Sequence, residues 1–354
     1  MNRAELESLV YSGEAITGVD LAGADLAGAR LTGATMERVN LAGADLTGAV
    51  LKEVVLADCD LRGARLTDVD WRHGVGYRTR FGDASLRGAR MAVARVTECD
   101  LAGADLSGAD MELIAVTKSS LRGVRLVGAR LERGALLECE MEGADLTDAD
   151  LLATTLLRAD LTRARSLRAR FERTILIEAR LAGADLSSMS LRHCQFLDAD
   201  LAGCDLRGAV LAGANFKGAD LRRARLDGAR GPLALFVEAK LAEATATRGV
   251  FRQSAFQSAD LGAADFSGAD LYQCNFQRAT AVGVRMVGCD LTYADFSRAD
   301  LTRADLTSAS MFRAVLHEVR DDDAVITGRA LALGSDPDVA EAEAWHARVN
   351  RRRE

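Results

Sequence analysis

The stretch DLAGADLAGAR, residues 20–30, repeats itself every five residues. In an α-helix, five residues advance the chain by about 500°, so Leu21, Leu26 and Leu31 would not share one face. In a flat strand, side chains alternate with period two, so these leucines would fall on opposite faces. The chain therefore needs a backbone in which every fifth residue is equivalent, and an extended segment followed by a bend meets that need.

The repeat keeps one register from Ile16 to Leu316. Residues numbered in 1 or 6, here called centres, are large and apolar, and the residue two before each centre is small, most often Ala. In an extended segment these two positions point the same way, which we take to be inward. The two residues after a centre often end in Gly, which suits a turn. The centres that depart from the pattern are Gly76, Ser166, Gly231, Ala246 and Ala281.

Longer periods indicate how many segments close one turn of the coil. Phenylalanines recur as centres every 20 residues, and charges of alternating sign recur at the same interval in another column. Both patterns make sense if residue i stacks on residue i+20, about 4.8 Å away. The sequence thus predicts an all-β solenoid with four sides per coil. The two columns are Phe196, Phe216, Phe236, Phe256, Phe276 and Phe296, and Arg38, Asp58, Arg78, Glu98, Lys118, Glu138, Arg158 and Glu178.

The motif A-(D/N)-L-x-x, as in Ala24-Asp25-Leu26 and Ala264-Asp265-Phe266, resembles that of the pentapeptide-repeat family. The resemblance covers residues 16–316. It implies a right-handed quadrilateral β-helix. At four pentapeptides per coil, the repeated region would form about 15 coils, each rising roughly 4.8 Å along the axis. Its ends would be exposed strand edges that need caps.

Both termini carry helix signals. Asn2-Arg3-Ala4-Glu5 is typical of a capping box, so we expect a capping helix in residues 1–15, the β-helix in 16–320, and a linker and helix in 321–354. The second helix either caps the solenoid or joins two copies into a homodimer. Its apolar stripe would consist of Val339, Ala342, Trp345 and Val349.

Residues that carry chemistry do not converge in the sequence. The cysteines all fall at the small inward position, which predicts a packing role, and the four histidines are scattered. The many Asp residues before centres are expected to lie in solvent and accept hydrogen bonds from nearby backbone. We therefore expect no enzyme, no cofactor and no metal site. The cysteines are Cys59, Cys99, Cys139, Cys194, Cys204, Cys274 and Cys289.

Outward positions of several consecutive coils are apolar, which is typical of an interface. Alternatively, a loop or terminal helix of the same chain covers them. A basic cluster around Ser166 could meet phosphate or an acidic partner, although ordinary solubility is the preferred explanation. Two irregular stretches, 71–81 and 231–250, predict bulges or bends. The apolar positions are Ala135, Leu137, Thr155, Leu157, Ile175, Ile177 and Leu197, and the basic ones are Arg163, Arg165, Arg168, Arg170 and Arg173.

Two classes of function fit such a chain. The favoured hypothesis is a rod-shaped, non-enzymatic protein-interaction scaffold in the cytoplasm, with an accessory role in a bacterial secretion apparatus of the type VI kind as a family analogy. The alternative, implied by the quinolone-resistance members of the family, is a DNA mimic that binds type II topoisomerase (gyrase). Residues 16–320 hold 41 acidic and 39 basic residues, which is far from the charge density of DNA. We expect protein partners, no membrane segment and no direct nucleic-acid binding.

Overall fold

The computed structural model describes residues 1–164, 168–335 and 345. The chain divides into two compact units, which are described separately. The first unit consists of Met1–Leu186 and Ser190–Asp200, and the second of Ser187–Met189 and Leu201–Glu354. The same 20-residue winding recurs in both units.

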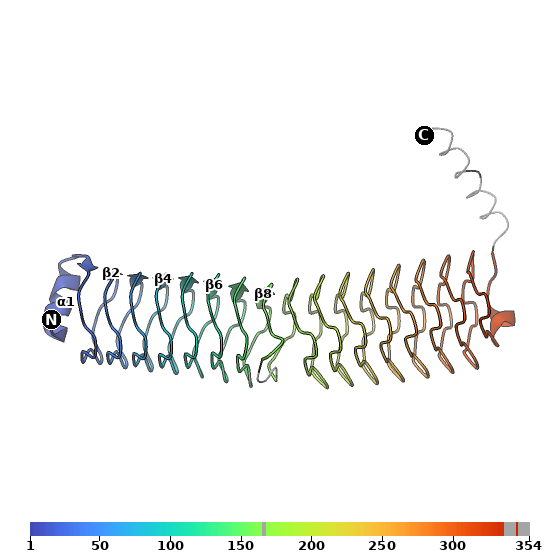
Figure 1. Cartoon of the computed structure of the whole chain (residues 1–354), viewed down its shortest axis with the longest axis horizontal. Helices are drawn as coiled ribbons and strands as arrows, with labels where there is room; N and C mark the ends of the chain where they lie inside the picture. The colour runs from blue at the N-terminus through green and yellow to red at the C-terminus, as the bar shows by residue number, and fades with distance from the viewer. Residues whose placement is uncertain (165–167, 336–344, 346–354) are drawn as a thin grey trace. The chain divides into compact units, whose positions relative to one another are not determined.

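The first unit is built on one sheet of eight parallel strands that pair in sequence order. Each strand pairs with the strand one turn later, so that Met36 lies beside Leu56 and Leu56 beside Gly76. Figure 1 shows these strands on one side of successive turns. The unit is therefore an all-parallel β-solenoid. The strands are β1 (Ile16–Thr17), β2 (Thr35–Glu37), β3 (Val55–Ala57), β4 (Val75–Tyr77), β5 (Arg95–Thr97), β6 (Ala115–Thr117), β7 (Ala135–Leu137) and β8 (Thr155–Leu157).

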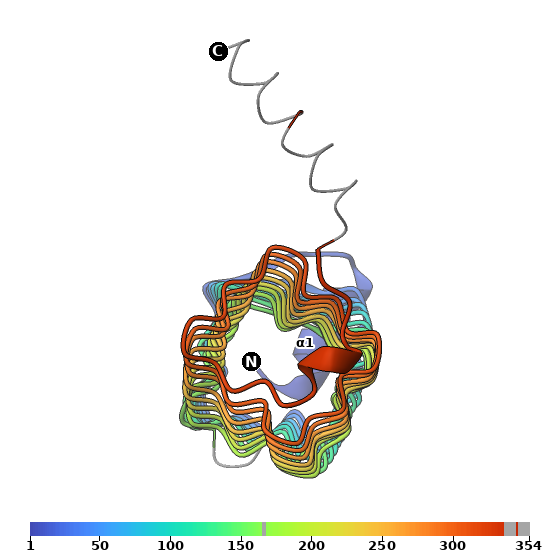
Figure 2. The same cartoon turned by 90° about the vertical axis from the view of Figure 1, so that its right-hand side faces the viewer.

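Single parallel bridges join residue i to residue i+20 elsewhere in each turn. Asp25 pairs with Asp45 and Arg30 with Val50 in the first unit, and Asp205 pairs with Arg225 in the second. Viewed end on in Figure 2, the backbone of each unit winds in successive turns of similar outline. In the second unit the rings of Phe216 and Phe236 are stacked, with centroids 4.9 Å apart and planes within 2°. The predicted stacking of residue i on residue i+20 is confirmed.

The bend after each centre is a turn whose third residue has left-handed backbone. The carbonyl of Leu21 accepts from the amide of Ala24 at 3.1 Å, and Gly23 between them has φ +64°. Many corners place a larger residue in the same conformation, among them Val93 with φ 62°. Because glycine adopts this conformation without steric cost, its frequency after the centres follows from the corner geometry.

The core consists of the centres and the small residues two before them, nearly all of which are buried. Of the bulges or bends expected in the two irregular stretches, the ladder shows no bulge, because β4 pairs in regular register and Arg230 pairs with Val250. Aromatic rings instead fill the space left by glycine: a Cβ added at Gly74 would lie 2.0 Å from Nε1 of Trp71. The missing volume at one position is thus supplied by a large neighbour.

Helix α1 (Arg3–Tyr11) covers the first coil, and its N-terminus has the predicted capping box between Asn2 and Glu5. Leu6 is fully buried, and the Arg3 guanidinium donates to the carbonyls of Ala27 at 2.7 Å and Gly28 at 2.8 Å. The helix therefore supplies partners to backbone groups that the first turn would otherwise leave open.

At the other end, parallel pairing continues beyond residue 320, where the repeat pattern predicts its end. Asp305 pairs with Val325, and Val315 pairs with Leu333 after a turn that is two residues shorter. A short 3-10 helix, η1 (Arg329–Leu331), lies in this last turn. The expected linker from residue 321 is thus corrected, because residues up to Leu333 still belong to the solenoid.

We expect the small inward position to tolerate no added volume. Ala264 is fully buried, so Ala264→Leu should overpack the coil and lower the free energy of unfolding by about 1–3 kcal/mol. Thermal denaturation followed by circular dichroism measures this. Ala22→Leu, at an exposed corner position, is the matched control and should leave the melting temperature unchanged. Equal losses for the two variants would contradict the assignment of inward and outward positions.

Candidate protein-interaction surface

Four of the predicted interface residues lie one above another in successive turns of the first unit. Leu137 and Leu157 are register partners in β7 and β8. The amide of Arg158 then donates to the carbonyl of Ile177 at 3.0 Å, and the amide of Glu178 to that of Leu197 at 2.9 Å. We call Leu137, Leu157, Ile177 and Leu197 the apolar ridge.

The ridge side chains are half-buried although they point away from the core. In β7 and β8 the central residue is buried and its two neighbours are partly exposed, which is the pattern of one inward and two outward positions. Ile175 is also half-buried and pairs with Thr155 next to the ridge. Stacked apolar side chains shield one another, so the ridge is a continuous apolar strip that is partly exposed to solvent.

Immediately after the ridge, the ladder between two successive turns is interrupted. The amide of Glu138 donates to the carbonyl of Leu157, and the amide of Asp148 donates to that of Arg168. Between these two bonds, no backbone hydrogen bond links residues 139–143 to 160–163, all of which the structure describes. The bond from Asp148 to Arg168 spans one residue more than the usual interval of 19, as between Gly108 and Val127. Ser166, the polar centre in the repeat, was the sequence signal for this irregularity.

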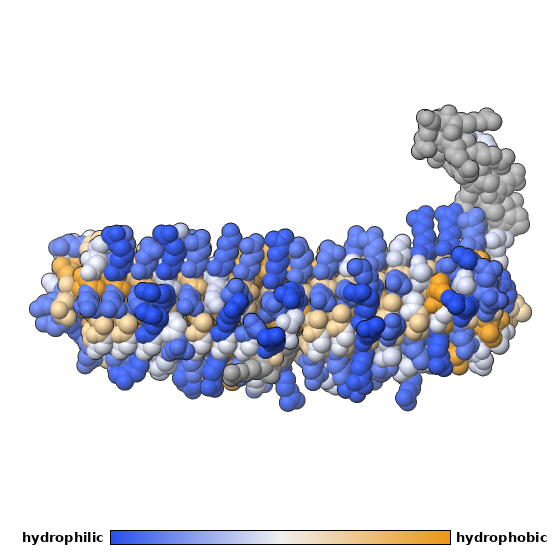
Figure 3. Space-filling model, viewed as in Figure 1, coloured by the Kyte–Doolittle hydropathy of each residue, from blue (hydrophilic) through white to orange (hydrophobic). Residues whose placement is uncertain are grey.

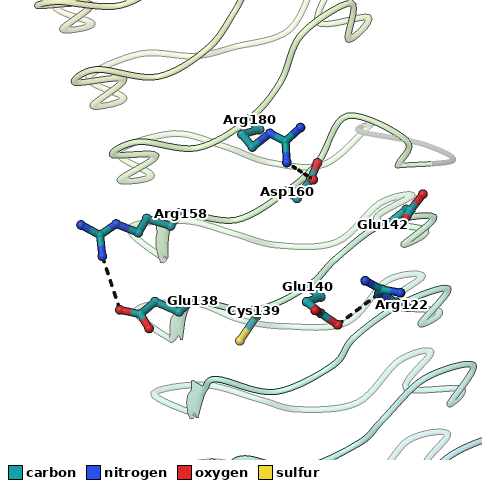
Figure 4. A pocket seen from close by; sticks show the side chains of 8 residues that line it. All are labelled: Arg122, Glu138, Cys139, Glu140, Glu142, Arg158, Asp160 and Arg180. Carbon is teal, nitrogen blue, oxygen red and sulfur yellow. Dashed lines mark hydrogen bonds and ion pairs between the residues drawn. The ribbon is translucent and has the colours of Figure 1, made fainter.

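A hollow of about 490 Å³ lies over the interruption (Figure 4). Charged residues from adjacent turns line it in pairs. Arg158 lies 3.6 Å from Glu138, Arg122 lies 3.1 Å from Glu140, and Arg180 lies 2.8 Å from Asp160. Beside these pairs, Arg163 binds Glu142, which also lines the hollow, at 2.8 Å. Cys139 forms part of the lining. Nothing in the repeat pattern predicted this hollow.

Carboxylates before the centres bind the backbone locally, as predicted, and also bind Arg side chains one turn later. The Oδ1 atom of Asp20 accepts from the amide of Ala22 at 3.1 Å. Asp60 contacts Arg62 at 2.7 Å and Arg80 at 3.0 Å, and the hydrogen bond from Arg62 lowers the pKa of its carboxyl group. On the face drawn in Figure 3, hydrophilic side chains form rows between narrower apolar areas. Much of the acidic charge is thus neutralised in place.

The cysteines are buried as predicted, but several of them also form hydrogen bonds. In the first unit Cys59, Thr79, Cys99, Ser119 and Cys139 occupy one inward column at intervals of 20 residues. The corner before this column lacks the usual turn bond, so the amide of Cys59 reaches Oγ1 of Thr79 at 3.4 Å, and the amide of Cys99 reaches Oγ of Ser119 at 3.0 Å. Burial raises the pKa of Cys99 and of Cys139 to about 11, so both thiols stay neutral. In the sequence, the signal for this hydrogen-bonding column is the alternation of Cys with Thr and Ser at intervals of 20 residues.

The remaining candidates are spread over other parts of the chain. Arg170 contacts Asp150 at 3.3 Å, as in an ordinary charge ladder, while Arg165 lies outside the described residues. Trp345 is 58% exposed. The other residues of the predicted terminal stripe, Val339, Ala342 and Val349, also lie outside the described part of the chain.

Within the described residues, no three His, Cys, Asp or Glu side chains are grouped so that they could hold a metal ion. None of the described helices is long and apolar enough to cross a bilayer.

We expect the thiol and hydroxyl column to stabilise the fold through its hydrogen bonds. Thr79 Oγ1 donates to the carbonyl of Leu56 at 3.0 Å and accepts from the amide of Cys59, so Thr79→Val should leave buried groups without partners. The loss should be about 1–3 kcal/mol in chemical denaturation. Thr117→Val makes the same change at a half-exposed position and should cost little. An equally stable Thr79→Val protein would show that the bonds contribute nothing.

Asp45 offers a test of the charge ladder by pH. The Thr47 hydroxyl at 2.6 Å, the Thr47 amide and Arg65 at 2.6 Å together lower the pKa of its carboxyl group to about 2. The stabilisation is therefore present above the ordinary value of 3.8 and disappears as the pH falls through about 2. Carbon-detected NMR titration should show the low pKa and an upward shift in Thr47→Ala. Titration of Asp45 near 3.8 in the unmodified protein would contradict the geometry.

The sequence matches the family model described as pentapeptide repeats. Among solved structures, HetL, a pentapeptide repeat protein involved in heterocyst differentiation regulation from the cyanobacterium Nostoc sp. strain PCC 7120, is 23% identical, with 81% of this chain and 97% of that chain covered and a TM-score of 0.26. QnrB1, a plasmid-mediated fluoroquinolone resistance protein, is 19% identical over 55% of this chain and 90% of that chain, with a TM-score of 0.39. A comparison with curated proteins gave no match. The family model matches residues 16–52, 36–70, 55–91, 77–113, 125–163, 139–176, 156–192, 194–230, 234–273 and 269–307. Since these matches span most of the chain, the protein belongs to the pentapeptide-repeat family.

Proposed function

We propose that this protein is a non-enzymatic interaction scaffold whose apolar ridge, together with Ile175, binds a protein partner. The observation that carries the proposal is the alignment of Leu137, Leu157, Ile177 and Leu197 in four successive turns. The scaffold would be a right-handed quadrilateral β-helix of about 15 coils, in keeping with bridge columns spaced five residues apart. Capping helices in residues 1–15 and at the C-terminus belong to the same proposal.

The energetic reason lies in the unburied part of the ridge. Burying an exposed Leu or Ile side chain completely contributes roughly 1.5–3 kcal/mol. The ridge residues are already half-buried, so each retains only part of that gain, but four of them aligned in successive turns act as one surface. The same column carries Thr97 and Thr117 in the preceding turns, so the repeat itself does not require apolar residues there. A partner that covers the ridge explains why these turns differ.

The alternative, a DNA mimic that binds type II topoisomerase, requires a continuous negative face. The arrangement of charges favours the scaffold, because Arg side chains bind the acids in the column that would form such a face. Asp60 contacts Arg62 and Arg80, and Asp160 contacts Arg180. A DNA gyrase supercoiling assay separates the two functions, since a scaffold leaves supercoiling unaffected and a mimic inhibits it.

By analogy with the family, we place the protein in the cytoplasm of a bacterium, as an accessory of a secretion apparatus. The partner is either another protein or a second copy of this chain. In the second case the terminal residues Val339, Ala342, Trp345 and Val349 are candidates to contribute to a homodimer. Light scattering on the full chain and on a chain ending at residue 335 tests that contribution.

We expect the double substitution Leu157→Asp, Ile177→Asp to abolish partner binding while the fold is retained. Both side chains point outward, and two carboxylates on the ridge make its burial unfavourable. Light scattering measures self-association, and a pull-down compared quantitatively with the unmodified protein measures partner capture. Thr97→Asp, Thr117→Asp is the matched control, because it introduces the same charges in the same column outside the ridge.

Circular dichroism distinguishes the possible failures of this experiment. A double variant that unfolds would show that a loop or terminal helix of the same chain covers the ridge. A folded double variant that binds as well as the control would show that the ridge is not the interface. Either result overturns the proposed function.

A further inference from the structure

The interrupted ladder leaves two buried backbone groups without partners in the described chain. Met141 has none of its surface exposed, and its amide has no acceptor. Cys139 is 2% exposed, and no backbone amide donates to its carbonyl. Buried backbone groups are nearly always paired, so this donor and this acceptor require a partner from outside the two coils.

The neighbouring turns show what kind of partner fits. The amide of Leu121 donates to the carbonyl of Glu140 at 2.8 Å, and the amide of Glu140 donates to the carbonyl of Ser119 at 3.2 Å. One residue of the later turn thus supplies both groups. The same exchange joins Asp160 and Arg180, at 2.8 and 2.9 Å. Between Glu140 and Asp160 both bonds are missing, so the open pair beside Glu140 matches the amide and carbonyl of a single residue in a parallel extended strand.

We propose that the interruption binds an extended peptide segment of the protein partner, one residue of which takes the pairing position of Asp160 beside Glu140. Its amide donates to the carbonyl of Cys139, and its carbonyl accepts from the amide of Met141. This is strand addition at a local opening of the ladder, with the hollow of about 490 Å³ as the space for the segment. The inference rests on the proposed interaction function and names the mode of recognition and the chemistry of the segment.

The charges around the opening select a basic residue at the paired position. Where the ladder is closed, a carboxylate is commonly followed by Arg one turn later, as in Asp60 with Arg80 at 3.0 Å and Asp160 with Arg180 at 2.8 Å. Glu140 is instead followed by Asp160, a second carboxylate. A Lys or Arg side chain of the bound segment would lie between these two acids, each of which contacts a single Arg from a turn on its far side, Arg122 at 3.1 Å for Glu140 and Arg180 at 2.8 Å for Asp160.

Hydrogen exchange tests the opening in the full-length protein. We expect the Met141 amide to exchange much faster than the amides of Leu121 and Leu161, which occupy the same position in neighbouring turns and are bonded. The probe is a peptide with the sequence of Ile177–Gly183, IEARLAG, blocked at both ends, because its Arg is the residue that pairs with Asp160 in the chain. Addition of this peptide should slow exchange at Met141 and leave Leu121 unchanged.

Fluorescence anisotropy with the labelled peptide tests the chemistry of recognition. Methylation of the peptide nitrogen of the Arg removes the donor to Cys139 and should weaken binding about tenfold. Glu140→Arg in the protein should also weaken binding by placing like charges together. Asp100→Arg is the matched control, since Asp100 lies in the same column with its ladder closed, and should bind as the unmodified protein does. Circular dichroism of both variants checks that they are folded.

Each contrary result has a distinct meaning. Slow exchange of Met141 in the free protein would show a closed ladder and overturn the inference. Rapid exchange without protection at about 1 mM peptide would show that water fills the opening, and equal binding of the methylated peptide would show that charge alone holds it. Both results overturn the inference as well. The ridge experiment is unaffected by any of them, so the proposed function stands or falls separately.

Discussion

Backbone hydrogen bonding between residue i and residue i+20 is the interaction on which the rest of the structure depends. Each turn provides the amides and carbonyls that the next turn needs, so no turn is complete alone. The bonds also bring chemically equivalent positions into columns, where Phe216 stacks on Phe236 and Asp60 binds Arg80. A substitution in this protein therefore acts on the residues one turn before and one turn after it, more than on its neighbours in sequence.

The regular part of the fold could be predicted from the sequence, because regular columns appear as simple periods. The inward positions, the stacking interval and the helix at Asn2–Glu5 all follow from spacing and residue size. Bulges or bends were expected around Gly76 and Gly231 because spacing treats a missing side chain as a defect, but the ladder has no bulge there. In the structure Trp71 occupies the space beside Gly74 and Gly76, so volume is conserved across neighbouring positions and the register is kept.

The candidate site was only partly predictable. The apolar ridge is a column, and its residues could be aligned by counting. The hollow beside it depends on the loss of bonds between residues 139–143 and 160–163, and the only signal was a polar centre several residues away. The hydrogen-bonding role of Cys99 likewise depends on a corner that lacks its usual turn bond, which residue type does not reveal. Sequence periodicity describes the rule, whereas these features arise where the rule is locally broken.

The break in the ladder also bears on how the first unit unfolds. In a solenoid, the stability of each turn comes chiefly from its contacts with the adjoining turns, so unfolding spreads along the chain as far as that coupling is strong. The interval between Glu140 and Asp160 has lost part of its coupling. It is therefore one weak link in the spread of unfolding through this unit. We therefore expect unfolding that starts in the turns after Asp160 to pass less readily into the turns before Glu140, which α1 closes at one end.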